Sequence, residues 1–355
     1  MKIAVTSDLH LTTMEKNPER YKALKEIFRM CGKLEVQLLI IAGDLFDKKM
    51  ANYSDFDRIY GESKLPGLKT IIIPGNHDLT LQSANLIGDG LVVFSEPVLE
   101  SLNNSRKILF LPYKVEQTMG EAIAPFRNQL KDERWILIAH GDWTGSHNSS
   151  DPYEKGTYMP LTRTDIALYN PEMAILGHIH LPQNKDVVYY PGSPCPLDIS
   201  ETGPRRILIF DSNKGEIESH QVNSQLEYYD ERFVMLPVEN DLELLINDVN
   251  NRIDNWNIAP SREKYVQVRV KITGTSQSDR SKVLQAVKNA LSSFRLYLDQ
   301  EPDLQELSHN PDPDRADISE KLKTWIDELD WDEIPSNPKK DQILEEALKI
   351  IYGAD

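Results

Sequence analysis

Histidines and acidic residues recur in short groups along the first half of the chain. In chain order these groups are Asp8 and His10, then Asp44, then Asn76 and His77, then His140, and finally His178 and His180. Carboxylates, an amide oxygen and imidazoles together form a donor set that suits Mn²⁺, Fe²⁺ or Zn²⁺ better than Ca²⁺ or a soft metal. The sequence therefore predicts a divalent-metal site assembled from distant segments.

Each of these groups follows a short apolar run of the kind that forms a buried strand. The runs cover residues 3–5, 38–41, 70–73, 135–138 and 174–176. Runs of this length that end at Gly, Pro or a polar turn are typical of strands in a sheet covered on both faces. Side chains that follow successive parallel strands meet at one edge of the sheet, so we expect these groups to converge in space.

The spacing within the groups suggests how the site could work on a phosphate ester. Asp44, in the tight segment Gly43-Asp44-Leu45, is the natural bridge between two cations, which such a carboxylate holds roughly 3.5–4 Å apart. A cation pair activates water and binds the phosphoryl oxygens. Asp8 and His10 are two residues apart, so in extended backbone both would face the site, and the same argument pairs His178 with His180.

His77 is expected to act on the substrate. It directly follows Asn76, so in extended backbone its side chain would point away from the metal that Asn76 faces. A histidine in that place can stabilise the phosphoryl group or protonate the leaving oxygen. Asp47 lies three residues after Asp44, close enough to orient this imidazole.

Composition places the chain among soluble globular proteins. It has 355 residues, of which 40% are hydrophobic, and its net charge is −16. Most of that charge lies in residues 299–355, where 17 acidic residues accompany 6 basic ones, so it argues against nucleic-acid binding mainly in the tail. We expect no transmembrane helix, no cleavable leader ahead of Asp8, two free thiols at Cys31 and Cys195, and a cytoplasmic location.

The pattern of strands and helices predicts an α/β protein in three parts. Residues 1–228 alternate strands and helices and form the domain with the metal groups. Residues 229–300 contain a βαβαβ pattern that predicts a small α/β cap domain. Residues 301–355 combine an acidic linker, at 301–317, with two amphipathic helical segments at 318–329 and 343–351. These two segments either pack on their own cap or dock on a partner.

Taken together, the motifs resemble the calcineurin-like metallophosphoesterase superfamily over roughly residues 1–225. They read Asp-x-His, Gly-Asp-x-x-Asp, Gly-Asn-His-Asp, an intervening His140, and Gly-His-x-His. The resemblance implies a four-layer α-β-β-α sandwich with His77 as the catalytic histidine and Asp47 as its orienting acid. It also implies one ion held by Asp8, His10, Asp44 and His180, and a second held by Asp44, Asn76, His140 and His178.

Within that superfamily the chain looks like the SbcD-type DNA repair exonucleases. The segments that carry this likeness are Ser7-Asp8-Leu9-His10-Leu11, Gly43-Asp44-Leu45-Phe46-Asp47 and Tyr190-Pro191-Gly192-Ser193-Pro194. The likeness implies a Mn²⁺-dependent nuclease that processes DNA ends in repair and recombination. It also implies a homodimer whose C-terminal helices bind an SMC-like ABC ATPase. Gly192 and Ser193 would then bring backbone amides towards the substrate phosphate.

Several alternatives stay open at this point. A metallophosphatase or a phosphodiesterase for cyclic nucleotides could use the same two-metal site, and a non-catalytic scaffold would be expected to lack some ligands. The cap has no stripe of basic residues, because its lysines and arginines alternate with acids. Phosphate contacts would then contribute little affinity for DNA. Residues 53–65 and 81–91 form either the dimer surface or part of the core.

Overall fold

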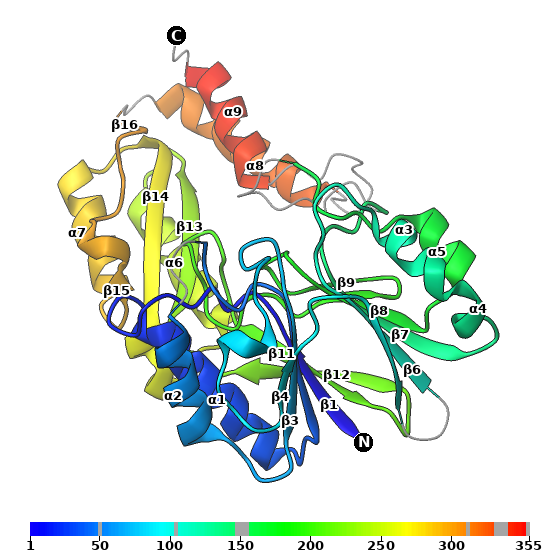
Figure 1. Ribbon diagram of the computed structural model, residues 1–355. Coiled ribbons are helices and arrows are strands. Elements are labelled where there is room, and N and C mark those ends of the chain that lie inside the picture. The colour runs from blue at the N-terminus through cyan, green and yellow to red at the C-terminus, as the bar shows by residue number, and fades with distance from the viewer. Residues whose placement is uncertain (49–51, 103–105, 146–155, 310–312, 330–339, 353–355) are drawn as a thin grey trace. The chain divides into compact units, whose positions relative to one another are not determined.

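The computed structural model describes residues 1–48, 52–102, 106–145, 156–309, 313–329 and 340–352 (Figure 1). The chain divides into two compact units, Met1–Glu227 and Tyr228–Asp355. We refer to these as the first unit and the second unit. All the residues predicted to bind metal belong to the first unit.

Two six-stranded sheets form the centre of the first unit in the part of the chain that the structure describes. The first sheet has the order β12 (Glu216–Val222), β11 (Arg205–Asp211), β1 (Lys2–Thr6), β2 (Leu38–Ala42), β3 (Lys69–Ile73) and β4 (Leu91–Val93). The second has the order β5 (Val98–Leu102), β6 (Arg106–Leu111), β7 (Arg134–His140), β8 (Met173–Gly177), β10 (Val188–Tyr190) and β9 (Gln183–Lys185). In each sheet the strands before the predicted ligands are parallel.

Helices cover the outer face of each sheet, which completes the expected α-β-β-α sandwich. The helices α1 (Pro18–Lys33) and α2 (Tyr53–Ser63) share one apolar core with the first sheet. On the second sheet, α3 (Met119–Ile123), α4 (Arg127–Leu130) and α5 (Arg163–Tyr169) pack around a separate core. A third core fills the space between the sheets. The predicted fold class is confirmed.

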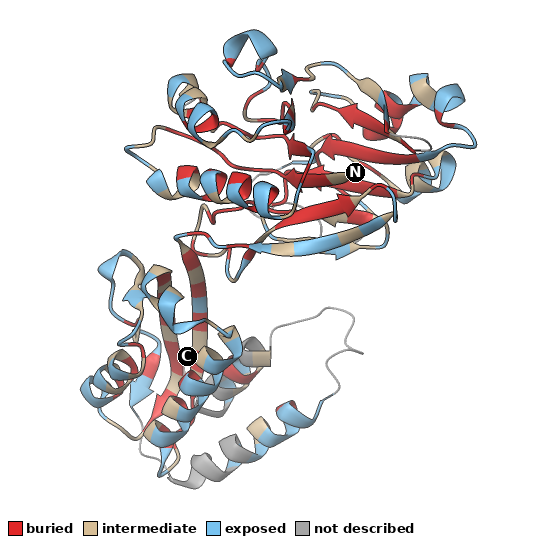
Figure 2. Cartoon of the chain, turned by 90° about the horizontal axis from the view of Figure 1, so that it is seen from below, coloured by how far each residue is buried: buried red, intermediate tan, exposed pale blue. Residues whose placement is uncertain are grey.

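The burial pattern explains why the strand sequences are almost uniformly apolar. All five residues of β2 are buried, because Leu39 and Ile41 face the helices while Leu38 and Ile40 face the other sheet. Figure 2 shows buried residues running along the strands, whereas the helices are exposed on one side. A strand covered on both faces gains from an apolar side chain at every position, at roughly 25 cal/mol for each Å² of apolar surface buried. The two free cysteines, Cys31 and Cys195, are buried, as expected.

The second unit is a small α/β domain whose sheet has the order β13-β14-β15, with β16 pairing to β14. Its elements are β13 (Glu227–Met235), α6 (Asp241–Trp256), β14 (Val266–Ser276), α7 (Arg280–Ala290), β15 (Arg295–Leu296) and β16 (Leu307–His309). The expected third strand is therefore only two residues long. The segment predicted to be a linker contains the strand β16. Its register with β14 pairs Gly274 with Leu307, so this segment extends the sheet.

The two C-terminal helices, α8 (Pro313–Glu328) and α9 (Lys340–Tyr352), contact each other and part of the cap. Ile326 of α8 and Leu344 of α9 are buried in one cluster with Leu236, which follows β13. Trp325 and Ile350 remain largely exposed. Part of each apolar stripe therefore packs within the second unit. In the described part of the chain no helix is long and apolar enough to span a membrane.

Candidate metal centre

The loops that follow β1 and β2 run side by side and bring three predicted ligands together. Backbone N–H groups of Asp8 and His10 donate to the carbonyl oxygens of Gly43 and Asp44 at 3.1 and 3.0 Å. Asp8, His10 and Asp44 all have positive φ, at 55°, 44° and 51°. Non-glycine residues seldom adopt this left-handed conformation, and it occurs where the surrounding structure fixes it, often at functional sites.

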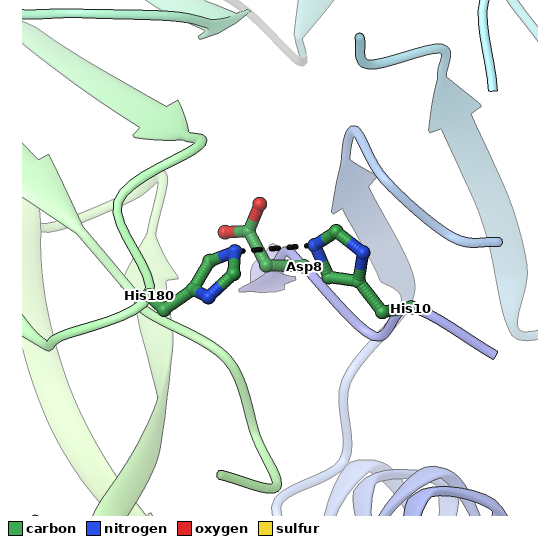
Figure 3. A group of neighbouring side chains, drawn as sticks. All are labelled: Asp8, His10 and His180. Carbon is green, nitrogen blue, oxygen red and sulfur yellow. Dashed lines mark hydrogen bonds between the residues drawn. The ribbon is translucent and has the colours of Figure 1, made fainter. Parts of the chain in front are cut away.

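This conformation corrects one step of the sequence argument. Asp8 and His10 were expected to share a face because side chains two apart in an extended strand do so. Here β1 ends at Thr6, and the left-handed backbone turns both side chains into the same region. A ligand atom from each lies within 4.8 Å of one from His180, as Figure 3 shows.

Asp44 lies at the centre of the predicted site. Its Oδ2 is 3.5 Å from His10 Nε2 and 3.4 Å from His140 Nε2, and its Oδ1 accepts the backbone N–H of His77 at 2.8 Å. The side chain is almost completely buried. Burial alone raises the pKa of the Asp44 carboxyl, but the imidazoles around it, His140 foremost, hold that pKa well below its usual value. Asp44 is therefore an anion facing several imidazoles, as a bridging ligand must be.

His140 comes from the end of β7 in the second sheet and reaches across to the first. Its Nδ1 is 3.0 Å from the carbonyl oxygen of Ala42, and its Nε2 is 2.8 Å from Asn76 Oδ1. Burial lowers the pKa of His140, yet the carboxylates of Asp44 and Asp8 outweigh burial and raise it to about 10. A cation bound here must displace that proton, so its affinity rises with pH.

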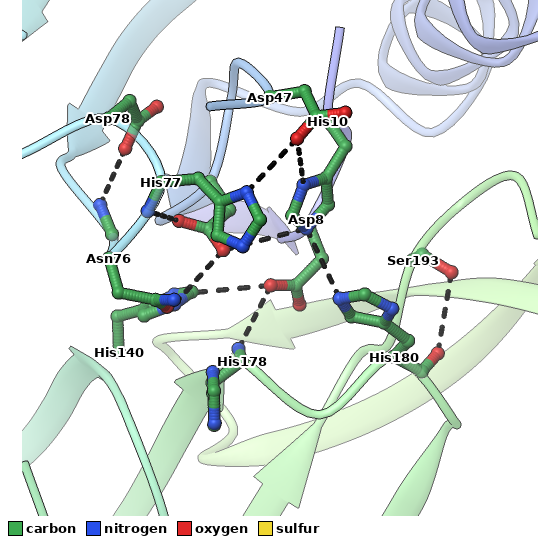
Figure 4. Close-up of polar contacts among 12 residues, drawn as sticks. Asp8, His10, Asp47, Asn76, His77, Asp78, His140, His178, His180 and Ser193 are labelled. Carbon is green, nitrogen blue, oxygen red and sulfur yellow. Dashed lines mark hydrogen bonds and ion pairs between the residues drawn. The ribbon is translucent and has the colours of Figure 1, made fainter. Parts of the chain in front are cut away.

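His77 lies beside the cluster in contact with Asp47. The His77 Nδ1 is 3.1 Å from Asp47 Oδ1, and the His77 ring meets the His10 ring edge-on at a centroid distance of 4.5 Å (Figure 4). Hydrogen bonds from His10 and His77 hold the pKa of Asp47 far below its usual value, so this acid stays ionised. A ring nitrogen of His77 also lies within 4.8 Å of ligand atoms of His10 and Asp44. The position of His77 therefore suits contact with the substrate or with a bound cation.

His178 takes a different position from its predicted partner His180. Its φ is 98°, so the two residues do not share a strand face. The His178 ring lies 4.7 Å from the Tyr158 ring, its Nε2 is 3.6 Å from Asp142 Oδ1, and its backbone N–H donates to Asp8 Oδ1 at 3.0 Å. Among the described residues, several acids and histidines form groups whose ligand atoms all lie within 4.8 Å of one another, and His178 belongs to none of these groups. Its assignment as a ligand stays a prediction.

Gly192 and Ser193 lie behind the site. Ser193 is completely buried, and its hydroxyl donates to Glu201 Oε2 at 2.9 Å. Gly192 has φ 75°, and a Cβ there would lie 2.5 Å from the carbonyl oxygen of His180, which explains the glycine. Both residues thus support the backbone of His180, and their expected contact with substrate stays a prediction.

Two buried acids near the site were not predicted from the sequence. Asp78 accepts backbone N–H groups of Gly75 and Phe46 at 2.7 and 3.1 Å, and so ties the β2 and β3 loops together. Burial, with a smaller contribution from Asp44, raises its pKa to about 7. The sequence feature that could have identified Asp78 is its place directly after His77 in the motif Gly-Asn-His-Asp. Glu201, which faces His180, has no such signal because it lies outside every motif.

The residues present fit divalent cations. Asp8 Oδ2 is buried and makes no hydrogen bond within the described residues, which leaves an acceptor aimed at the cluster. His10 Nε2 and His180 Nε2 face each other at 3.1 Å, as two lone pairs directed at one cation would. Carboxylate, amide and imidazole donors together suit Mn²⁺, Fe²⁺ or Zn²⁺.

A two-sheet sandwich with acids and histidines at its strand ends is the architecture of a metal-dependent hydrolase. The calcineurin-like phosphoesterase family matches residues 1–182, and the chain belongs to this family. The chain also matches a solved structure described as a novel archaeal phosphodiesterase, with 16% identity over 62% of this chain and 99% of that one. The TM-score of that match is 0.34.

Proposed function

We propose that this phosphoesterase is a DNA nuclease that hydrolyses phosphodiester bonds at DNA ends with two divalent ions, Mn²⁺ above all. The supporting observation is the convergence of Asp8, His10, Asp44, Asn76, His140 and His180 at the strand ends of both sheets, with His77 held beside them by Asp47. When bound, the two ions would supply a nucleophilic water and neutralise charge on the attacked phosphoryl group.

The protein side chains have separate tasks in this proposal. Asp44 would be shared between the ions, because it is buried among the imidazoles and belongs to two of the three acid and histidine groups of metal-ligand spacing found in the described residues. His77 would contact the phosphoryl group or the leaving oxygen, since its side chain is partly exposed whereas that of His140 is fully buried. Asp47, an ionised acceptor 3.1 Å from His77 Nδ1, would fix the orientation of that ring.

The nuclease proposal can be tested against small-molecule phosphodiesterase activity. Purified protein with Mn²⁺ is offered labelled duplex ends, single strands and cyclic nucleotides. The proposal expects DNA degradation, and degradation of cyclic nucleotides alone would reject it. Asp8→Ala, prepared identically, should be inactive on every substrate, which excludes a contaminating nuclease.

The charges on the cap suggest that a partner strengthens DNA binding. Several of its basic side chains pair with acids of the second unit: Arg269 with Asp230, Lys288 with Glu301, and Lys271 with Glu306. Lysines and arginines that are already paired with acids neutralise few DNA phosphates and so release few of the counterions condensed on DNA. The affinity for DNA from this surface is therefore modest. We propose an SMC-like ABC ATPase as the partner, with both proteins acting in the cytoplasm during DNA repair and recombination.

The proposed partner surface is the part of α8 that remains exposed. Trp325 is 66% exposed, whereas the neighbouring Ile326 is 4% exposed and belongs to the packed cluster. Pull-down of the native protein should recover the ATPase, and Trp325→Ala should reduce its recovery without changing thermal stability. Leu168→Ala, which removes an apolar side chain that is 50% exposed on α5, is the control. Equal recovery with both variants would contradict this surface.

We also propose that the protein forms a homodimer. Residues 53–65 and 81–91 were the two segments predicted to form either the dimer surface or the core. In the first, α2 buries Phe56, Ile59 and Tyr60 in the core, so these side chains cannot contact a second copy. Ile87, in contrast, is 77% exposed. Sedimentation of the full chain should give a dimer, and Ile87→Glu should shift it towards monomer. A monomeric wild-type protein would refute the proposal.

A further inference from the structure

His180 is held from behind by a buried carboxylate. Its Nε2 faces the candidate metal centre, 3.1 Å from His10 Nε2, and its Nδ1 is 2.8 Å from Glu201 Oε1. Glu201 lies 21 residues further along the chain and is 1% exposed. A carboxylate this deeply buried normally needs several donors to offset its desolvation.

Those donors are present, and they also hold the backbone of His180. Glu201 Oε2 accepts the Ser193 hydroxyl at 2.9 Å and the Leu197 backbone N–H at 3.0 Å. The buried guanidinium of Arg205 donates to the main-chain carbonyl oxygens of both Glu201 and His180. The carboxylate and the histidine therefore belong to one hydrogen-bonded unit built from the loop between β8 and β9, the segment after β10 and the start of β11.

We propose that Glu201 is a positioning residue that sets the tautomer of His180. An ionised carboxylate can only accept hydrogen bonds, so the ring nitrogen that faces it must carry the proton. A neutral imidazole has one N–H, and placing it on Nδ1 leaves the lone pair of Nε2 pointing at the metal centre. Carboxylates that contact a metal-binding histidine from behind commonly act in this way.

The Glu201→Gln variant separates this role from simple support of the fold. Two donors, the Ser193 hydroxyl and the Leu197 N–H, point at Oε2, so the glutamine oxygen is favoured at that position. Its amide NH₂ then faces His180 Nδ1 and donates to it. That arrangement moves the ring proton to Nε2, where it blocks metal binding, although the size of the side chain is unchanged.

The tautomer can be read directly by ¹⁵N NMR of histidine rings in the metal-free protein at alkaline pH, with His180 assigned from the His180→Asn spectrum. The wild type should show the proton on Nδ1, and Glu201→Gln should show it on Nε2. Calorimetric titration with Mn²⁺ should give an affinity roughly 10- to 100-fold weaker in Glu201→Gln. Glu172→Gln, which breaks a buried ion pair remote from His180, is the matched control and should retain both properties.

Two results would overturn the inference. One is a wild-type His180 with its proton on Nε2, a reading that does not use Glu201→Gln and so holds even if that variant fails to fold. The other is a folded Glu201→Gln protein with the wild-type tautomer and wild-type Mn²⁺ affinity. The inference rests on the metal-binding part of the proposed function. Because neither measurement involves nucleic acid, failure of the nuclease proposal would leave these results unchanged.

Discussion

At the scale of single residues, the proposed function separates side chains that would hold cations from one that would meet the substrate. His140 and Asp44 are buried and contact each other, whereas His77 is partly exposed and contacts the outer acid Asp47. A buried imidazole next to a carboxylate is suited to binding a cation, and a partly exposed one is suited to moving a proton. The two roles make different predictions for substitution.

His77→Ala should cut turnover by roughly 10²- to 10⁴-fold while metal content stays at the wild-type level. The reason is that Asp44 and His10 keep their other contacts when the His77 ring is removed. Turnover of a phosphodiester and metal content by elemental analysis are measured on the same preparation. His220→Ala on strand β12 is the control, because that ring pairs with Glu218 at the sheet edge. Loss of metal from His77→Ala would instead assign His77 as a ligand.

Which residues converge could be predicted from the sequence, but how they point could not. The order of groups after apolar runs identified Asp8, His10, Asp44 and His140, because parallel strands end at the same edge. The left-handed backbone of Asp8 and His10 comes from hydrogen bonds to the neighbouring loop, which no local pattern encodes. Glu201 was missed for a similar reason, since its partner His180 lies outside its local sequence.

At the scale of elements, the strand ends are close enough to exclude any side chain between them. A Cβ at Gly75, just after β3, would lie 2.1 Å from Asp44 Oδ1 and 2.5 Å from the Asp44 backbone nitrogen. A Cβ at Gly177, the last residue of β8, would lie 2.0 Å from the Ala42 carbonyl oxygen. These glycines are therefore required for the approach of the loops rather than for flexibility.

Gly75→Ala should displace Asp44 and weaken Mn²⁺ binding, by roughly 10- to 100-fold as for other disturbances around a ligand. Calorimetric titration measures this. Gly61→Ala is the matched control, because Gly61 lies in α2 and a Cβ there meets nothing within 4 Å. Gly61→Ala should leave Mn²⁺ binding unchanged and stabilise the protein by about 0.5–1 kcal/mol. Normal binding by Gly75→Ala would show that the loops can separate without loss of the site.

Glu172, just before β8, joins two neighbouring strands through Arg106 and Arg134. It is hydrogen-bonded to Arg106 Nε at 2.7 Å, and this contact lowers the pKa of Glu172 below its usual value. A lowered pKa adds stability above the unfolded-state pKa of about 4.3, and that stability is lost as pH falls through the folded-state pKa. Glu172→Gln should therefore cost about 1–3 kcal/mol at neutral pH and little at strongly acid pH. Denaturant unfolding of both proteins across this range tests it; a cost independent of pH would contradict it.

At the scale of the whole molecule, the chemistry and the cap belong to separate units. Every predicted ligand, His77 and the buried acids around them lie within Met1–Glu227, which has its own three cores. The second unit has a separate core built on β13, β14, α6 and α7. The change of pattern in the sequence predicts a domain boundary at residue 228, and the described chain divides after Glu227. The place of β16 in the sheet was not, because its partner β14 lies some thirty residues earlier.

A protein truncated after Glu227 should fold, bind Mn²⁺ as the full chain does and hydrolyse a chromogenic phosphodiester. It should be less active on duplex ends, because we propose that the cap supplies the modest DNA contacts that this chain makes by itself. Circular dichroism, Mn²⁺ titration and both assays on the two proteins measure this. Retention of full activity on duplex ends would remove the cap from the proposal, and loss of Mn²⁺ binding would show that the first unit depends on the second.

The position of β1 in its sheet has a consequence during synthesis of the protein. β1 pairs with β2 on one side and with β11 on the other, where Lys2 lies opposite Asp211. A nascent chain therefore carries an unpaired apolar edge from the synthesis of β1 until the segment around residue 211 has left the ribosome. Such edges attract other strands, and pairing over so long a separation is slow. The first unit should accordingly depend on chaperones at the translation stage more than its final stability suggests.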